Sequence, residues 1–387
     1  MLGLCLALIH AAAPGDAVFV VHGVSAGALP VAEYHTWHFY ADNPVLVGEE
    51  EYEMQAGEGN VYAPDVLRDG DRYRMWYGGQ ARDGHDRIHL AESDDGLRWL
   101  RAADNPAIDV DGENHVNDPS VVRVDGTYYM SFSVAPTAEE DEVHLATSKD
   151  GRAWTRRGSV IPFGGPGAWD SFKVGRPSLL HEDGRFRMWY DGTNSNPADR
   201  QKIGEPAARH VGLATSEDGI GWTPDPRSPL VQHSGAVDVA RVGDGYVLLA
   251  ESGRGTRWLT SDDGVQWEDR GLLFSNSGED YDRYGQVTPM AYVEEGAWVA
   301  VYFGGAPAAN WNRNCIAVAF AQKRITLRGP TGAEIPTNIR ALDRDTAVIA
   351  TSATGERATL AMHAPDGSVV SEQALSLKAG RVVLGAP

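Results

Sequence analysis

Cysteine is almost absent from this chain, which has only Cys5 and Cys315 among its 387 residues. Two cysteines so far apart exclude a disulfide-rich scaffold, and neither their number nor their spacing suits a metal cluster. If Cys5 belongs to a cleaved leader, Cys315 is a single thiol, and we expect it to be buried. No apolar run approaches the length that spans a bilayer, so we expect no membrane segment.

Positive charge is also scarce, since 34 Lys and Arg stand against 54 Asp and Glu, for a formal net charge of -20. A field of this sign argues against nucleic acid or an anionic membrane as a partner. The sequence has no His-x-x-x-His pair, no EF-hand loop and no Gly-rich turn that would cradle a phosphate. It therefore predicts an acidic globular protein without a cofactor.

One short pattern, Ser-x-Asp-Gly-x-x-Trp, occurs four times, and its Trp residues are separated by 55, 68 and 45 residues. Asp-Gly suits a tight hairpin, because Gly tolerates positive φ and the Asp side chain accepts backbone N–H bonds. We expect these Asp residues to be structural and the Trp residues to pack on neighbouring sheets. The intervals fit four-stranded propeller blades with variable loops. The four Trp residues are Trp99, Trp154, Trp222 and Trp267.

A second repeated element, a turn followed by an alternating aromatic strand, occurs five times. A short apolar strand separates it from the hairpin, for example at 88–91 and 143–147, so each unit supplies about four strands. We therefore predict an all-β protein with a five-bladed β-propeller at 43–322 and a small β-rich C-terminal domain at 323–387. The five copies are 69–79, 125–132, 183–192, 244–249 and 295–305.

The segment 1–42 has two interpretations. The apolar run Leu2–Ile9 and the small residues Ala11–Ala13 are typical of a signal peptide, although no Lys or Arg precedes them. On this reading the protein is secreted or periplasmic. Alternatively Val18–Val21 is a strand that pairs with a sheet edge, and without a signal peptide we expect a cytoplasmic protein.

Polar residues stand at the start of each first strand, where the blades of a propeller converge on a central channel. Charged residues at such inner positions cost several kcal/mol to desolvate unless they are paired or serve a ligand. We therefore expect them to surround one pocket. They are Asp65, Asp118, Arg176, Asp238 and Gln286.

Several motifs resemble the five-bladed propeller glycoside hydrolases, which include arabinanases, β-xylosidases, invertase relatives, anhydrogalactosidases and mannoside phosphorylases. They are the Tyr-Ala-Pro-Asp start at 62–65, the Asn-Asp-Pro start at 117–119, the Met-Trp-Tyr strands and the lead-in at 43–46. The resemblance covers 43–322. It implies one carboxylate as base or nucleophile, a second that tunes its neighbour's pKa and a third that protonates the leaving oxygen. It assigns Asp65 as base or nucleophile and Asp118 as base or modulator.

The third blade departs from that family, because Arg176 stands where arabinanase-type relatives carry a Glu-x-Pro acid. An Arg donates no proton at useful pH, but it can clamp an anion or hold a neighbouring Asp ionised. The candidates for the missing acid are Asp238 and Glu251, then Asp170, then His115 and His233. The expected substrate-binding residues are Arg176, Asp170, His115, Trp169, Gln286 and Tyr284, with Trp169, Trp311 or Tyr284 as a stacking platform.

The leading function is a glycoside hydrolase that acts on poly- or oligosaccharides, so its partner is a carbohydrate. A phosphorylase or transferase is the first alternative, favoured if Lys173, Arg176 and a His form an anion site. A non-catalytic sugar-binding propeller is the second. The family resemblance also leaves open a structural calcium ion near Asp118 or Asp238, and the oligomeric state stays undetermined at this point.

Overall fold

The computed structural model describes residues 17–22, 36–55, 57–137, 140–194, 209–242, 244–293, 299–322, 324–331, 333–335, 338–343, 346–351, 358–363, 369–375 and 382–384. In these ranges the chain forms strands and two short 3-10 turns, with no α-helix. No helix there has the length and apolar character to cross a membrane. Contacts divide the chain into one unit of residues 42–292 and 301–318, and another of residues 1–41, 293–300 and 319–387.

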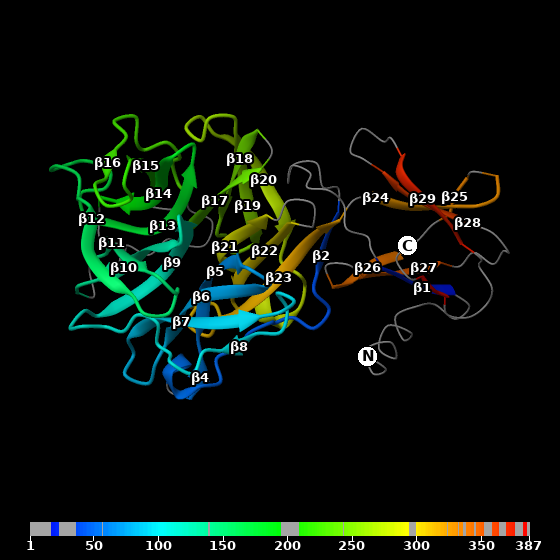
Figure 1. The fold of residues 1–387 in the computed structure, drawn as a ribbon, viewed down its shortest axis with the longest axis horizontal. Helices are drawn as coiled ribbons and strands as arrows, with labels where there is room; N and C mark the ends of the chain where they lie inside the picture. The colour runs from blue at the N-terminus through cyan, green and yellow to red at the C-terminus, as the bar shows by residue number, and fades with distance from the viewer. Residues whose placement is uncertain are drawn as a thin grey trace. The chain divides into compact units, whose positions relative to one another are not determined.

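Five four-stranded sheets form the blades of a propeller, and strands β5, β9, β13, β17 and β21 begin them (Figure 1). The predicted all-β fold with a five-bladed propeller is confirmed. The first two blades are β5 (Val61–Asp69), β6 (Arg72–Gln80), β7 (Asp86–Ser93) and β8 (Leu100–Arg101), then β9 (His115–Val124), β10 (Thr127–Ala135), β11 (Glu142–Ser148) and β12 (Thr155–Ile161). The next two are β13 (Lys173–Glu182), β14 (Arg185–Thr193), β15 (His210–Ser216) and β16 (Thr223–Pro224), then β17 (Val237–Val242), β18 (Gly245–Ala250), β19 (Gly255–Ser261) and β20 (Glu268–Ser275).

The fifth blade takes its outer strand from a part of the chain that precedes the first blade. Its order is β2-β23-β22-β21. β2 lies ahead of residue 43, where the sequence analysis places the start of the propeller. The fifth blade consists of β21 (Gln286–Val293), β22 (Val299–Gly305), β23 (Cys315–Gln322) and β2 (Thr36–Phe39). The short elements beside the blades are η2 (Glu51–Glu53), β3 (Met54–Gln55), β4 (Glu58–Gly59) and η3 (Asp280–Asp282).

The repeated hairpins have the structural role that we predicted. In the first copy, Asp95 Oδ1 accepts the N–H groups of Leu97 and Arg98, both at 2.8 Å. Trp154 of the second blade packs edge-on against Trp76 of the first, with ring centroids 6.1 Å apart. The same bonds recur at Asp150, Asp218 and Asp263, and the same packing recurs between Trp99 and Tyr302 and between Trp267 and Trp189.

Buried tryptophans of the first and third blades also bind the hairpin of the next blade. Trp76 is fully buried, and its Nε1–H donates to the Gly151 carbonyl at 3.1 Å. Gly151 has φ 72°, and a Cβ there would lie 3.1 Å from the Trp76 ring, so a side chain does not fit. Trp189 makes the equivalent bond to Gly264 at 2.9 Å. Cys315 is buried, as we expected, and burial raises the pKa of its thiol to about 12.

The smaller unit contains two further four-stranded sheets, which agrees with the β-rich region expected after residue 323. The segment Val18–Val21 does form part of a strand, but it pairs on both sides rather than at an edge, with β27 antiparallel and β30 parallel. Residues 1–16 lie outside the described ranges. One sheet holds β26 (Asn338–Asp343), β27 (Thr346–Thr351), β1 (Ala17–His22) and β30 (Val382–Leu384), and the other β25 (Glu334–Ile335), β24 (Arg324–Arg328), β28 (Ala358–His363) and β29 (Val369–Leu375).

Candidate active site

One residue at the same position in each blade has a left-handed backbone. These five residues have φ between 42° and 50°, and none is glycine. In the first three blades the register of the neighbouring strand pair shifts beside this position. Such bulges re-aim side chains, and strained positions of this kind gather at functional sites. We call them the bulge ring, which consists of Ala63, Asp118, Arg176, Ala236 and Thr288.

Two residues further along the same strands lies an inner ring that joins each blade to the next. Asp65 Oδ2 accepts the Val121 N–H at 3.0 Å, and Asp238 Oδ2 accepts the Ala291 N–H at 2.9 Å. Serines make the same contact in the blades between. They are Ser120, which binds the Leu179 N–H at 2.9 Å, and Ser178, which binds the Val239 N–H at 2.8 Å. Asp65 and Asp238 therefore occupy a position at which the second and third blades carry serine.

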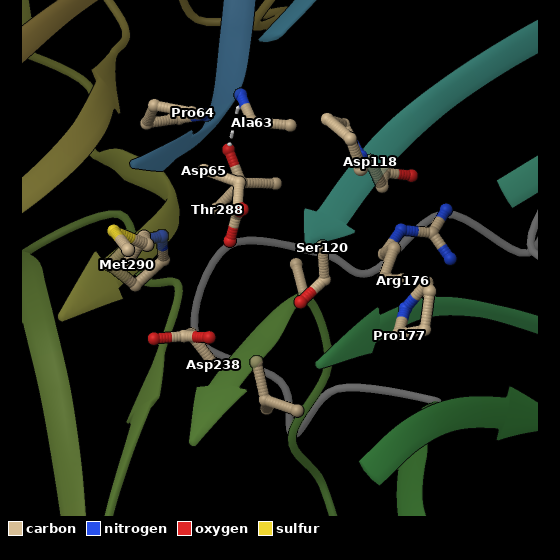
Figure 2. A pocket seen from close by; sticks show the side chains of 14 residues that line it. Ala63, Pro64, Asp65, Asp118, Ser120, Arg176, Pro177, Asp238, Thr288 and Met290 are labelled. Atoms are coloured by element: carbon tan, nitrogen blue, oxygen red, sulfur yellow. Dashed lines mark hydrogen bonds between the residues drawn. The ribbon is translucent and has the colours of Figure 1, made fainter. Parts of the chain in front are cut away.

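Both rings line one central pocket, in which Asp65, Asp118, Arg176 and Asp238 lie as the sequence predicts (Figure 2). The pocket has about 30 Å³ of free volume, enough for about one or two water molecules but not for a sugar ring. Burial, reinforced by Asp238, raises the pKa of Asp65 well above its usual range. Burial also raises the pKa of Asp238 to about 6. A sugar ring therefore does not fit between these two carboxyl groups.

A network of charged side chains lies at the bulge ring. The Arg176 guanidinium is 3.0 Å from Asp191 Oδ1, and Arg209 is 3.0 Å from Asp191 Oδ2. Arg209 also reaches Glu251 at 2.7 Å. Arg176 and Lys173 lie 3.6 Å and 3.2 Å from Asp141. We call this the charged network, and its members are Asp118, Asp141, Lys173, Arg176, Asp191, Arg209 and Glu251.

Asp118 is a carboxyl group of the network whose proton affinity is raised. Burial raises its pKa to about 6, while Arg176 and a hydrogen bond with Ser133 oppose the rise and Asp191 and Asp141 add to it. The side chain is buried, yet it lines the central pocket. A carboxyl group with a pKa near the working pH can exchange a proton with a bound substrate.

A hydrogen-bonded group beside Asp118 supports its bulge. Tyr62 Oη donates to Asp86 Oδ2 at 2.8 Å and accepts from Asn117 Nδ2 at 3.0 Å. His115 Nδ1 accepts the Asp86 N–H at 3.0 Å. Burial raises the pKa of Asp86, and burial together with Asp86 and Asp118 raises that of Tyr62. Asn117 directly precedes Asp118, so this group holds the strand on one side of the bulge.

Comparisons with known proteins agree with the fold. Residues 31–166 match the Glycosyl hydrolases family 32 N-terminal domain. An uncharacterized protein of Mycobacterium tuberculosis is 33% identical over 138 residues, which covers 33% of this chain and 45% of that protein. A 1,2-beta-oligomannan phosphorylase of Thermoanaerobacter sp. is 29% identical (31% and 44% covered), and an A type blood N-acetyl-alpha-D-galactosamine deacetylase of Flavonifractor plautii is 24% identical (47% and 27% covered). The chain therefore matches less than half the length of each relative.

Solved structures show the same arrangement of blades. A protein described as a glycoside hydrolase has a TM-score of 0.57 at 18% identity and covers 72% of this chain and 93% of that one. A family 117 glycoside hydrolase of Zobellia galactanivorans has 0.57 at 16% (75% and 91% covered). A beta-1,2-mannobiose phosphorylase of Listeria innocua has 0.55 at 11% (74% and 97% covered).

The chain has the fold of the five-bladed propeller glycoside hydrolases. Within this fold, Asp118 and Arg176 belong to the same charged network as Glu251, one of the candidates for the missing acid. Asp65 and Asp238 belong to the inner ring, deeper in the channel. The two strand-start aspartates Asp65 and Asp118 are thus not equivalent, because the position of Asp118 is occupied by Ala63 in the first blade.

The other predicted residues of this propeller are not members of the charged network, although Asp170 and Trp169 lie against Gly192, which follows Asp191. Asp170 accepts a hydrogen bond from Tyr190 Oη at 3.3 Å, and Trp169 packs beside Tyr190 with ring centroids 5.6 Å apart. Gln286 is fully buried between Thr256 and Asp282, which bind its amide at 2.7 and 2.9 Å. None of these contacts faces the pocket. His115 supports Asp86 as described, and Tyr284 is 40% exposed at the surface.

Asp141, Asp191 and Arg209 were not among the candidate site residues, although the repeats carry a signal for them. Asp191 ends the strand Met-Trp-Tyr-Asp-Gly, where the first blade has Gly78. Asp141 and Arg209 directly precede the third strand of their blades and align with Asp86 of the first blade. Each stands two residues before a similar sequence, which is Ile-His-Leu-Ala for Asp86, Val-His-Leu-Ala for Asp141 and Val-Gly-Leu-Ala for Arg209. Alignment of the repeats beyond the first strand would have shown charged residues at matching positions.

The calcium ion considered from the resemblance has no ligand set in the part of the chain that the structure describes. No three His, Cys, Asp or Glu side chains are grouped there so that they could hold a metal ion. The Asp118 carboxyl group interacts with Ser133 and Arg176, and Asp238 with Ser178 and Ala291. These neighbours are hydrogen-bond donors, which do not suit a cation site.

Proposed function

We propose that this protein is a glycoside hydrolase that cleaves a glycosidic bond of an oligo- or polysaccharide at the charged network. The observation that carries the proposal is Asp118, a buried carboxyl group that lines the channel with a pKa of about 6. Cleavage requires a protonated acid and an ionised carboxylate at the same time. The match to a glycosyl hydrolase domain supports this activity.

Asp118 is the group that protonates the leaving oxygen in this proposal. Glu251 supplies the second carboxyl group, because Arg209 lies 2.7 Å from it and its side chain retains 14% exposure. Asp191 is only 2% exposed and lies between two guanidinium groups, so it acts as a positioning residue for Arg176 and Arg209. These roles keep Asp118 and Glu251 as catalytic residues, and they give Asp65 and Asp238 structural roles.

Activity screening with and without phosphate tests the proposal. Aryl glycosides and oligosaccharides identify a substrate, and Asp118→Asn and Glu251→Gln should then each lower kcat at least about a hundredfold. The value of kcat/KM should fall above about pH 6, as Asp118 loses its proton. Asp94→Asn, at an exposed hairpin position, is the matched control. Full turnover in both site variants would exclude the assignment.

A phosphorylase is the second candidate, because relatives and solved structures with that activity share similarity with this chain. The geometry favours hydrolysis. Lys173, Arg176 and Arg209, the cations of the charged network, already face Asp141, Asp191 and Glu251, so none of these three is left to hold phosphate. We therefore expect the same rate with and without phosphate. Absolute dependence on phosphate would establish the phosphorylase instead, and saturable sugar binding without turnover would indicate a binding module.

We also propose that the protein is exported, with the signal confined to residues ahead of β1. β1 begins at Ala17 and pairs with two other strands, so cleavage near Ala11–Ala13 would leave its sheet intact. Fractionation of expressing cells, followed by N-terminal sequencing of the mature protein, tests this. Intact residues 1–16 in the cytoplasmic fraction would refute it.

A further inference from the structure

A second hollow of this protein lies in the second blade, away from the central pocket. It has about 640 Å³ of free volume. Residues from β10, β11, β12 and the hairpin between β11 and β12 line it, and Ile220 from the hairpin of the third blade forms its far side. We call it the blade 2 groove.

The groove lies at the opposite end of the blade from the charged network. In the second blade Ser133 pairs with Asn117 beside the bulge ring, whereas Tyr128 pairs with Ser148 at the groove. The strand β10 therefore separates the two sites by about 17 Å at roughly 3.3 Å per residue. A ligand in the groove does not compete with one at Asp118 for the same space.

The contact between the second and third blades, beside the groove, differs from the equivalent contacts in one residue of the repeat. The second strands of the first and third blades carry Trp76 and Trp189, which reach the next hairpin and bind its glycine carbonyl. The second blade has Ser131 at this position. Ser131 is fully buried, and Trp222 donates to the Gly219 carbonyl at 3.1 Å in place of an indole from the second blade. Tyr129, which lines the groove, packs on Phe186 of the third blade with ring centroids 4.8 Å apart.

Charge at the groove is reversed relative to the other blades. In the first and third blades, the corresponding positions hold the ion pairs Arg72–Asp94 at 2.9 Å and Arg185–Glu217 at 2.8 Å. In the second blade the acidic residue is replaced by Lys149 and the arginine by Thr127, and Lys149 Nζ donates to Thr127 Oγ1 at 2.6 Å. The equivalent positions of the other three hairpins hold acidic residues, which are Asp94, Glu217 and Asp262.

Arg157 also lacks an acidic partner that the equivalent residue of the fourth blade has. In the fourth blade, Arg270 donates to Thr260 at 3.0 Å and forms an ion pair with Glu268 at 2.7 Å. Arg157 donates to the equivalent Thr147 at 3.1 and 2.9 Å, but Thr155 stands where Glu268 would be. Among the ion pairs of the described residues, none includes Lys149 or Arg157. Two exposed cations thus face one groove in a protein of net charge -20, while the Asp150 carboxylate at the same groove accepts backbone N–H groups of its own hairpin.

We propose that the blade 2 groove binds an acidic saccharide, with Lys149 and Arg157 on its carboxylate or sulfate group. Charge-assisted bonds from an ammonium and a guanidinium suit such a group, and the hydroxyl groups of Thr127 and Thr147 suit the neighbouring sugar hydroxyls. Exposed Ile220 offers an apolar surface to a ring face. This inference rests on the proposed function, because it makes the groove an accessory site that holds substrate while another part of it is cleaved.

Binding can be measured on the full chain by titration calorimetry at low salt. The probes are a trisaccharide of galacturonic acid, a sulfated galactose trisaccharide, neutral xylotriose and inorganic sulfate. We expect at least one acidic trisaccharide to bind and xylotriose not to compete with it. Which of the two acidic trisaccharides binds more tightly identifies carboxylate or sulfate as the group. Equal affinity for inorganic sulfate alone would show that no sugar is recognised and would overturn the proposal.

Variants that copy the other blades test the site without disturbing its backbone. Lys149→Glu places the residue type of the third blade in the second, and Thr155→Glu gives Arg157 the partner that Glu268 gives Arg270. Each should weaken binding of the acidic trisaccharide about tenfold or more, since it removes or neutralises one charge-assisted contact. Arg98→Glu changes the net charge as Lys149→Glu does, at a hairpin position that is 85% exposed, and should leave binding unchanged.

The outcomes separate this proposal from the proposed function. Lys149→Glu should keep the kcat of the wild type on a short neutral substrate, because the groove is remote from Asp118. If binding of the acidic trisaccharide survives both groove variants but is lost in Asp118→Asn, the ligand occupies the channel and the groove proposal is wrong. If the protein hydrolyses no glycoside at all but the groove variants lose binding, the groove stands as a site and the catalytic assignment fails.

Discussion

Replacing Asp118 with Asn should stabilise the folded protein at pH 8 while it abolishes activity. The pKa of this buried carboxyl group rises from 3.8 to about 6 on folding. A carboxyl group with a raised pKa contributes its full stability below the unfolded value and loses it as the pH rises through the folded value. Above pH 6 this loss amounts to about 3 kcal/mol. The amide of the Asp118→Asn variant carries no charge, so it avoids the loss.

The attraction of Arg176 to the ionised carboxylate is already included in the pKa of about 6, so it does not reduce this gain further. The amide oxygen of the variant still accepts the hydrogen bond from Ser133. We therefore expect a net stabilisation of roughly 2–3 kcal/mol at pH 8 and about 1 kcal/mol at pH 4.5, where the carboxyl group is protonated in the folded state but mostly ionised in the unfolded state. The ionised Asp118 carboxylate would thus lower the free energy of unfolding, although the proposed activity requires this carboxyl group.

The assay is urea unfolding, followed by the fluorescence of the buried tryptophans Trp76 and Trp189 at pH 4.5, 6 and 8. The midpoint difference between variant and wild type should grow with pH. Asp94→Asn serves as the control, since the Asp94 side chain is 78% exposed. A difference that is the same at pH 4.5 and pH 8, or one that favours the wild type more at pH 8, would refute the electrostatic argument for Asp118.

Two further predictions concern the structural residues around the site. Asp65→Ser inserts the residue type of Ser120, which also binds a backbone N–H of the next blade, so we expect stability within about 1 kcal/mol and kcat/KM within about tenfold of the wild type. A loss of a thousandfold or more in steady-state kinetics would instead restore Asp65 as base or nucleophile. Trp189→Phe leaves the buried Gly264 carbonyl without its indole donor and should cost about 2–3 kcal/mol in urea unfolding, with kcat unchanged per folded molecule. A drop in kcat without a change in stability would count against this structural role.

Repetition made most of the fold predictable. Each hairpin carries its own turn residues and its own Trp, so local sequence encodes the blade, and five aromatic strands give the number of blades. Only the outer strand of the fifth blade was placed wrongly in the chain order. Thr36–Phe39 pairs with β23, and almost all of the propeller lies between these two segments in the sequence. Local sequence patterns do not predict a contact between segments so far apart in the chain.

The site was only partly predictable. The strand starts led to Asp118 and Arg176, because the repeat aligns them in sequence. The same alignment of strand starts also predicted Asp65 as a catalytic residue. The residue equivalent to Asp118 in the first blade is Ala63, and Asp65 lies two residues further along the strand. Asp191 and Arg209 were missed because their function depends on each other and on Arg176, and pairs of that kind become visible only when strands are placed side by side.

The sequence by itself determined the all-β class, the five blades and the hairpins, since these depend on turn chemistry and strand alternation within short segments. Only the tertiary structure decided which charged residues meet. The left-handed backbone of the bulge ring turns Asp118 and Arg176 toward the channel. Asp141 and Arg209, which directly precede β11 and β15, join the same charged network. Burial and charge then set the pKa of Asp118, and both depend on neighbours that are distant in the chain.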